Sequence, residues 1–340
     1  MRKIVFNTFK YISFLAVGLI IFWFLYRKIE WSEMKSALRD LKYGFIFLSI
    51  IFGLLSHYSR AIRWKMLIKP LGYNPGIRNT FLSILVLYFV NLIVPRAGEV
   101  ARCTVLSRTD KIPFTKLVGT VFVERMADIL MLFVLAVIIF ATNISIVFRF
   151  FEENPMVSHK INEFFTTKNM VIIALGGILL LFLLYIVFKR LKKSRIKGKM
   201  VDLKNQFIEG IKSIAHMKSK WAFIGHTAFI FFMWLIMLYV VFLAYEPTEH
   251  LSLRVGMVTF LMGGLAMLAP VQGGIGPWHF MVVETLMLYG IPKKQGLIFA
   301  AIAHTSTNLV YILWGGIALL ILIFLYGNRT IRLKPNESKN

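Results

Sequence analysis

Residues 80–99, TFLSILVLYFVNLIVPRAGE, decide much of how this chain folds. An uncharged run from Thr80 to Val94 stops at Pro95, and a turn containing Gly98 follows it. The run is shorter than the roughly 20 residues that an α-helix needs to cross the hydrocarbon core of a bilayer. We therefore expect a short helix that breaks at the proline, not a complete membrane span.

A second stretch, GMVTFLMGGLAMLAPVQGGIG at residues 256–276, has the same organisation. The apolar segment from Gly256 to Ala269 stops at Pro270, and the following turn contains three glycines, Gly273, Gly274 and Gly276. Non-helical backbone at membrane depth is tolerated only where it contacts protein or a water-filled cavity, because unpaired amides cost several kcal/mol in lipid. Both stretches are therefore predicted to be re-entrant or broken helical hairpins beside a polar site.

The composition indicates that lipid surrounds most of the chain. Of the 340 residues 58% are apolar and the mean hydropathy is +0.70, which leaves too little polar surface to cover a soluble globule. Four uncharged runs are long enough to span a membrane: Ile129–Phe148, Asn169–Phe188, Trp221–Tyr245 and Gln295–Asn328. Segment 11–26 lacks a cleavage site, so we expect a retained span instead of a signal peptide. The single cysteine, Cys103, excludes an intramolecular disulfide.

Basic residues are concentrated between the apolar runs. Lys and Arg number 40 against 16 Asp and Glu, a net charge of +24, and the segment Lys189–Lys220 is the most basic. The positive-inside rule places this loop in the cytoplasm. The same rule applies to the basic stretches 60–69, 96–116 and 329–334, whereas 142–168 and 246–250 fit the outside. The charge is expected to attract anionic phospholipid, not nucleic acid.

These assignments predict an all-α, polytopic membrane protein with about six full spans and two re-entrant or broken helical hairpins. The spans are expected near 11–26, 43–59, 117–141, 169–188, 221–245 and 297–325, and the hairpins near 79–110 and 255–291. Both termini are predicted to be cytoplasmic. The basic residues of Arg27–Lys42 fit poorly with the outside location that this topology gives them.

The two halves of this topology have the same order of elements and opposite orientation. Inverted repeats with paired interrupted segments are common in transporters, where those segments point to the binding site. We therefore predict a single transmembrane domain, residues 1–340, made of two repeats. Its parts are repeat 1 at about 11–141, repeat 2 at about 169–326, the cytoplasmic loop at about 189–220 and a short basic tail at 327–340.

Three ordered motifs carry a resemblance to a known family. They are Asn91-Leu-Ile-Val-Pro-Arg-Ala-Gly-Glu-Val-Ala-Arg102, then Glu124-Arg125 with Asp128, then Pro270-Val-Gln-Gly-Gly-Ile-Gly276. In this order and spacing they resemble the flippase-like transmembrane domain of lysylphosphatidylglycerol synthases and its stand-alone relatives, from about Lys42 to Tyr326. The resemblance implies a lipid translocase, or a protein that handles a lipid carrier, in the bacterial inner membrane.

The chain departs from that family at one position. Many members carry a glutamate just after the second glycine turn, where this chain has His279, and the next acidic residue is Glu284. No acid role is therefore carried over to this position.

Charged residues inside the predicted spans indicate a polar pathway, because ionisable groups in a membrane usually face a cavity or each other. Glu124 and Asp128 lie four residues apart on one helical face, and two carboxylates in lipid require a cation. The candidates are Arg96 and Arg102. One interpretation is a site where arginines bind an anionic headgroup while the carboxylates exchange partners; the other is a structural ion-pair network. The predicted substrate-binding residues are Asn91, Arg96, Glu99, Arg102, Glu124, Arg125, Asp128, Gly273, Gly274, Gly276 and His279.

Other polar residues have two interpretations each. Arg60 and Arg63 are expected to be cytoplasmic anchors that extend to the interface, with headgroup guidance as the alternative. The amides of the turn at 273–276 are candidates for an anion site at a helix start, with close packing as the alternative. His279, Glu284, His304 and Asn308 are expected to be interior polar groups with satisfied hydrogen bonds, with a proton relay as the alternative.

No metal-binding, nucleophile or nucleotide-binding motif occurs in the sequence, so we expect neither an enzyme nor a cofactor. The first of two functions is translocation of an anionic lipid, a phospholipid or a polyprenyl-phosphate carrier, driven by a gradient or a coupled ion. The second is an integral-membrane transferase or accessory subunit of glycolipid or cell-envelope synthesis. The loop 189–220 lacks acidic pairs, which favours translocation. The expected partners are an anionic lipid headgroup and the bilayer, with a second copy or a cell-envelope synthesis protein also open.

Overall fold

The computed structural model describes residues 20–27, 29–142, 199–267, 269 and 271–330. The chain forms two compact units, one of residues 1–136 with 206–340 and one of residues 137–205. Most of the second unit lies outside the described residues, so the first unit is described here by itself. The predicted single domain with the boundaries given above stays a prediction.

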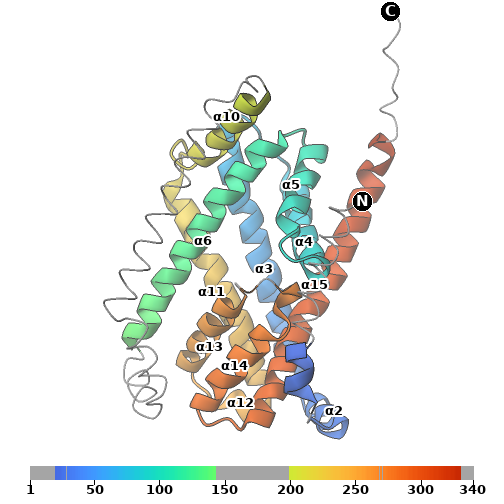
Figure 1. The fold of residues 1–340 in the computed structure, drawn as a ribbon, viewed down its shortest axis with the longest axis vertical. Helices are drawn as coiled ribbons and strands as arrows, with labels where there is room; N and C mark the ends of the chain where they lie inside the picture. Colours follow the sequence, from blue (N-terminus) through green and yellow to red (C-terminus); the bar gives the residue numbers. More distant parts are fainter. Residues whose placement is uncertain (1–19, 28, 143–198, 268, 270, 331–340) are drawn as a thin grey trace, which may run out of the picture. The chain divides into compact units, whose positions relative to one another are not determined.

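Every regular element in the described residues is helical, which confirms the all-α class (Figure 1). The first series is α2 (Trp31–Arg39), α3 (Tyr43–Ile68), the short 3-10 helix η1 (Lys69–Leu71), α4 (Ile77–Ile93), α5 (Gly98–Thr109) and α6 (Phe114–Thr142). The second series is α10 (Lys199–Lys212), α11 (Lys220–Ala244), α12 (Glu246–Glu249), α13 (Leu253–Ala266), the 3-10 turn η2 (Gln272–Gly274), α14 (Pro277–Leu288) and α15 (Lys293–Thr330). Four of these helices, α3, α6, α11 and α15, are long and apolar enough to cross a membrane.

The first predicted hairpin is confirmed as a pair of short helices. The last backbone bond of α4 runs from the Val94 amide to the Val90 carbonyl, and Pro95 follows. Arg96 then adopts a left-handed backbone with φ of 62°. At the start of α5 the Gly98 amide donates to Asn91 Oδ1 at 2.8 Å. A Cβ atom at position 98 would collide with the carbonyl oxygen of Leu87, so the close approach of α4 and α5 requires glycine here.

The second predicted hairpin is also a pair of short helices joined by a glycine turn. Gly273, Gly274 and Gly276 all have positive φ, at 56°, 77° and 91°, a conformation that glycine adopts at no steric cost. Pro277 then starts α14, the position where its fixed φ suits a helix and its missing amide hydrogen costs nothing. The Pro/Gly pattern of the sequence therefore located both breaks correctly.

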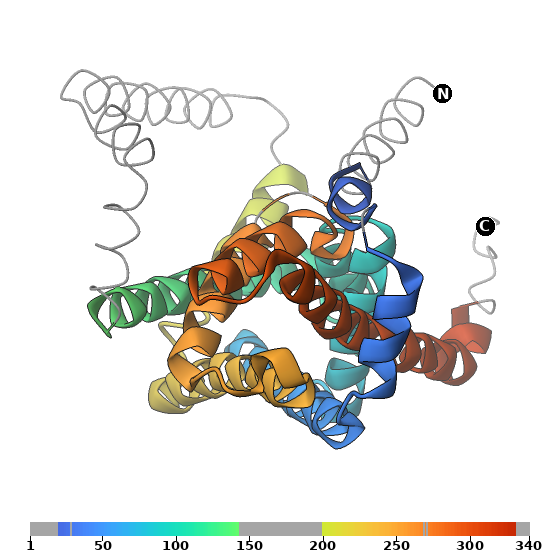
Figure 2. The ribbon, with the colours of Figure 1, turned by 90° about the horizontal axis from the view of Figure 1, so that it is seen from below.

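The first long helices of the two series, α3 and α11, run in opposite directions. The Lys42 amide bonds to the Ala244 carbonyl at one end of the α3/α11 pair, and Arg63 bonds to Thr227 at the other, so α3 and α11 are antiparallel (Figures 1 and 2). Both series, α3 to α6 and α11 to α15, contain two short hairpin helices between two long helices; the inverted repeat stays a prediction. The ends of the two hairpins meet, because a Cβ atom built on Gly273 would lie 3.0 Å from the Leu92 side chain.

The predicted span near 43–59 is too short, because α3 continues to Ile68. The sequence ended this span before Arg60, since arginine was taken to mark the membrane surface. In the structure Arg60 and Arg63 are 2% and 0% exposed, and their charges are paired inside the helix bundle. The spans near 117–141, 221–245 and 297–325 are confirmed as α6, α11 and α15.

Several predicted segments fall partly or wholly outside the described residues. Of the predicted span 11–26 only residues 20–26 are described, and they are helical. The span near 169–188, the loop up to residue 198 and the tail from residue 331 lie outside. Three described helices were not predicted, namely the short amphipathic α2, the one-turn α12 and α10, which lies in the predicted loop 189–220.

Candidate functional site

The centre of the site is the carboxylate of Glu124 on α6, which is fully buried. Arg60 Nε donates to Glu124 Oε1 at 2.8 Å, and Arg63 Nη2 donates to the same oxygen at 2.9 Å. Arg102 Nη1, on α5, donates to Glu124 Oε2 at 2.8 Å. Three guanidinium groups from two different helices therefore converge on one carboxylate.

Asp128 lies one turn further along α6 and is the second acceptor. Arg63 Nη2 donates to Asp128 Oδ1 at 2.7 Å, while Arg60 Nη2 reaches Asp128 Oδ2 at 3.3 Å. Arg125 Nη1 donates to Asp128 Oδ2 at 3.2 Å. Glu124 and Asp128 are held near each other because the two arginines of α3 bridge them, which offsets their mutual repulsion.

Glu99, in the first turn of α5, completes the set. It forms an ion pair with Arg102 at 2.7 Å and another with Arg125. The two guanidinium groups offset the cost of burying the Glu99 carboxylate.

We call these seven residues the arginine cluster. It consists of Arg60, Arg63, Glu99, Arg102, Glu124, Arg125 and Asp128. Its four positive and three negative charges leave one positive charge in excess. Glu124 lies ten residues after the start of α6, about 15 Å along the helix axis, so the cluster is well inside the span.

The cluster has a closed base and an open edge. The side chains of Arg60, Arg63, Arg102 and Glu124 are at most 2% exposed, whereas those of Asp128, Glu99 and Arg125 are 11%, 26% and 39% exposed. Neighbouring side chains fix the base. Arg60 Nη1 donates to Tyr88 Oη, Arg63 Nη1 donates to Thr227 Oγ1, and the Arg102 guanidinium lies 4.4 Å from the Trp64 ring centre.

A second polar group surrounds the glycine turn of the other hairpin. His304 Nε2 lies 2.7 Å from the Gly273 carbonyl oxygen, and Asn308 Nδ2 lies 3.0 Å from His304 Nδ1. The His279 and His304 ring centres are 4.4 Å apart. His304 therefore has a partner on each ring nitrogen, in agreement with its expected role as a satisfied interior group.

Comparison with known proteins agrees with the motifs in the sequence. The family model described as "Lysylphosphatidylglycerol synthase TM region" matches residues 12–315. The chain belongs to this family. A curated relative, the UPF0104 membrane protein MJ1595 of Methanocaldococcus jannaschii, is 37% identical over 87 residues, which are 25% of this chain and 26% of that protein. No solved structure matches the chain.

Membership in the lysylphosphatidylglycerol synthase TM region family gives the chain a multi-pass membrane location and a membrane lipid-related function. The match covers about a quarter of the curated relative's length, so that relative adds support for a membrane protein and no more. In the described residues no group of three or more His, Cys, Asp or Glu side chains is placed to hold a metal ion.

The structure brings five of the predicted binding residues together. Glu99, Arg102, Glu124, Arg125 and Asp128 all belong to the arginine cluster. Arg96, the other predicted partner of the carboxylates, is exposed on the turn between α4 and α5. Asn91 accepts the first amide of α5, so its side chain holds the hairpin closed.

The turn at residues 273–276 offers fewer free amides than the sequence suggested. The Gly276 amide points at His279 Nδ1, 3.4 Å away, and Pro277 has no amide hydrogen. An anion at the start of α14 would therefore have to use the amides after Pro277. The assignment of Gly273, Gly274, Gly276 and His279 to substrate binding stays a prediction.

The main residues that sequence reasoning misjudged are Arg60 and Arg63. They were expected to extend to the interface as anchors, which is wrong, because both are buried and paired with Glu124 and Asp128. Their spacing of three residues on one helical face, beside Trp64, matches the i, i+4 pair of carboxylates on α6. That match in spacing is the signal that identifies the partners.

Proposed function

We propose that this protein moves an anionic lipid, a phospholipid or a polyprenyl-phosphate carrier, across the inner membrane of a bacterium, and that the arginine cluster binds the headgroup. The observation that carries the proposal is the excess of arginine over carboxylate at a site well inside the bundle. Each arginine has a carboxylate partner, but the cluster as a whole keeps one net positive charge, and net charge inside a membrane is unfavourable. A phosphate group at the open edge would supply the missing negative charge.

The open edge defines where the headgroup would bind. Arg125 is the most exposed cation of the cluster, and its guanidinium contacts both Glu99 and Asp128. A planar guanidinium binds a phosphate through two parallel hydrogen bonds. We expect the phosphate to replace one of these carboxylates as the partner of Arg125, while Arg60, Arg63 and Arg102 remain on Glu124.

The helical arrangement suggests how the headgroup would cross. Two oppositely directed series with broken helices that meet at their tips are the arrangement expected of an inverted-repeat transporter. Rocking of one series against the other would expose the cluster first to one side of the membrane and then to the other. With no nucleotide-binding motif in the sequence, a gradient or a coupled ion supplies the energy.

The orientation follows from the distribution of charge. The end of the bundle that contains η1, the end of α5 and the start of α6 carries many basic residues, among them Lys69, Arg108, Lys111 and Lys116. We propose that this end faces the cytoplasm, with both termini on the same side.

Reconstitution in liposomes tests this proposal. Vesicles of phosphatidylcholine with a trace of fluorescent phosphatidylglycerol are treated with a membrane-impermeant quencher, and the fraction of label that becomes accessible over time is measured. We expect transport by the wild type, at least tenfold slower transport by Arg125→Gln, and wild-type rates for Arg108→Gln, an exposed arginine on α5 outside the cluster. Equal rates for the wild type, Arg125→Gln and protein-free vesicles would contradict the proposal.

A further inference from the structure

His57, on α3, is a buried ionisable residue that the arginine cluster does not contain. It is 1% exposed, and neither ring nitrogen has a hydrogen-bond partner among the described residues. A neutral imidazole has one donor and one acceptor nitrogen, and both are normally satisfied when the ring is buried. Two unpaired ring nitrogens on a buried histidine indicate that this ring binds a proton or a small molecule from outside the protein.

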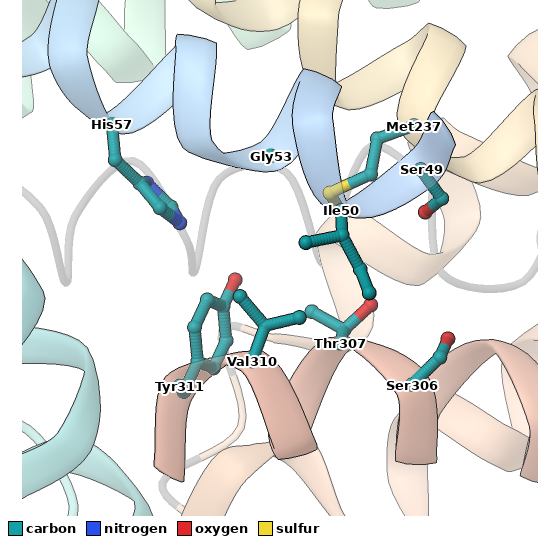
Figure 3. A pocket seen from close by; sticks show the side chains of 9 residues that line it. All are labelled: Ser49, Ile50, Gly53, His57, Met237, Ser306, Thr307, Val310 and Tyr311. Carbon is teal, nitrogen blue, oxygen red and sulfur yellow. The ribbon is translucent and has the colours of Figure 1, made fainter. Parts of the chain in front are cut away.

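The ring lines a small, mainly apolar cavity between α3 and α15 (Figure 3). The cavity has a volume of about 10 Å³, enough for a single water molecule. Figure 3 shows the His57 ring and the Tyr311 hydroxyl pointing toward each other across it. The hydroxyls of Ser306 and Thr307 also line it, and each donates its hydrogen to the Ala303 carbonyl. Their lone pairs and the Tyr311 hydroxyl oxygen are acceptors in a wall that is otherwise mainly apolar, and an imidazolium, which donates from both nitrogens, can use them.

His57 is connected to the arginine cluster through Tyr88. The His57 and Tyr88 ring centres are 4.2 Å apart, and Tyr88 Oη accepts a hydrogen bond from Arg60 at 2.8 Å. Arg60 itself is one helical turn from His57 on α3. The positive charge of Arg60 therefore opposes a second positive charge on His57 as long as the cluster carries its excess cation.

We propose that His57 binds one proton when an anionic headgroup occupies the arginine cluster, so that the proton and the lipid anion bind together. The inference rests on the proposed function, and it names the coupled ion. The anion cancels the excess charge of the cluster, which lowers the electrostatic repulsion that Arg60 adds to the larger cost of charging a buried ring. A proton from bulk water then binds the free ring nitrogen, and the imidazolium donates to the cavity acceptors.

The groups that face His57 have distinct effects on this equilibrium. On its own helix Arg60 opposes the proton. On α4 and α15 the phenols of Tyr88 and Tyr311 offer oxygen acceptors. On α11 the cavity residue is Met237, which does not titrate. The carboxylates of Glu124 and Asp128 act on His57 through Arg60, whose charge they partly neutralise.

Coupling of this kind is reciprocal. If the anion favours the proton, the proton favours the anion by the same factor. The affinity for an anionic lipid should then rise as the pH falls, by up to about tenfold per pH unit where one proton is taken up. A phosphodiester headgroup keeps its single charge throughout the physiological range, so the dependence reports on the protein.

Calorimetric titration of the full chain in detergent with dihexanoyl phosphatidylglycerol tests the inference. Titrations between about pH 5 and pH 8, in buffers with different ionisation enthalpies, give the number of protons taken up per lipid bound. We expect uptake that approaches one proton in the wild type and in His250→Gln, an exposed histidine outside the cavity. In His57→Gln we expect uptake near zero and an affinity that changes less than twofold over this range.

A second variant guards against a folding defect in His57→Gln. Tyr311→Phe keeps the ring against His57 and removes the hydroxyl, so the pH dependence should shift to lower pH with the same affinity at its acidic limit. Lipid binding by the wild type without proton uptake would overturn this inference alone and leave the cavity a water site. Undiminished uptake in His57→Gln would overturn it as well. If the wild type binds no lipid at all, that result contradicts the proposed function itself, and the inference that rests on it falls as well.

Discussion

Arg102 Nη1 on α5 lies 2.8 Å from Glu124 Oε2 on α6, and both side chains are fully buried. This bond joins the broken hairpin α4–α5 to a membrane-spanning helix. The charged cluster is thus both a candidate binding site and the attachment point of the hairpin. Any movement of the hairpin would therefore change the position of Arg102 relative to Glu124 in the proposed headgroup site.

Removing the central carboxylate should destabilise the protein strongly. Glu124→Gln leaves the buried Arg60, Arg63 and Arg102 without their shared partner, and breaking a buried ion pair typically costs about 3–5 kcal/mol. Thermal unfolding in detergent should show a clear loss for Glu124→Gln and a smaller one for Glu99→Gln, whose side chain is 26% exposed. Equal midpoints for the two variants would be inconsistent with Glu124 as the centre of the cluster.

The hairpin α4–α5 should not tolerate a side chain at Gly98. Gly98→Ala places a Cβ atom against the Leu87 carbonyl, a backbone atom that cannot turn away. We expect a loss of at least 2 kcal/mol in stability or a failure to accumulate as monodisperse protein. Gly44→Ala is the matched control, because nothing lies within 4 Å of its Cβ position. A normal Gly98→Ala protein would show that α4 and α5 are further apart than described.

We expect Asn91 to stabilise the hairpin and not to contact the substrate. Its Oδ1 atom accepts the Gly98 amide, so Asn91→Ala should lower the stability by about 1 kcal/mol, as for the loss of a helix cap. Asn91→Asp keeps the acceptor and should restore most of that stability. If Asn91→Ala instead keeps the wild-type unfolding midpoint and loses lipid binding, the residue contacts the substrate.

The orientation of the bundle can be tested by labelling in intact cells. Cys103, the single native cysteine, is buried and should give little background. With an impermeant maleimide we expect Glu249→Cys to react in intact cells and Arg108→Cys to react only after the membrane is opened. Labelling of Arg108→Cys in intact cells would reverse the proposed topology.

Sequence patterns predicted the fold better than they predicted the site. The uncharged runs located α6, α11 and α15, and the Pro95 and Pro270 breaks located both hairpins, because helix length and helix breaking are local properties. The end of α3 was missed because Arg60 was taken to mark the membrane surface. An arginine marks the surface only if no buried carboxylate pairs with it. That pairing depends on Glu124, which lies 64 positions further along the chain.

The carboxylates of the site were recognisable because they interrupt an otherwise apolar span. Glu124 and Asp128 share a face of α6, and their need for cations could be stated in advance. The sequence alone could not choose between Arg96 and Arg102 as their partner, since both lie on the same hairpin; in the structure Arg102 is buried and bonds to Glu124. Only the packing of α3 and α5 against α6 resolves that choice.

The central claim is that the arginine cluster selects and moves an anionic headgroup, and the transport rates of two lipids in one vesicle test it most directly. Liposomes would contain phosphatidylglycerol and phosphatidylcholine with distinguishable fluorescent labels. We predict faster transport of phosphatidylglycerol by the wild type, and loss of that preference in Arg125→Glu, which reverses the charge at the open edge. Equal rates for both lipids in the wild type, or an unchanged preference in Arg125→Glu, would contradict the account.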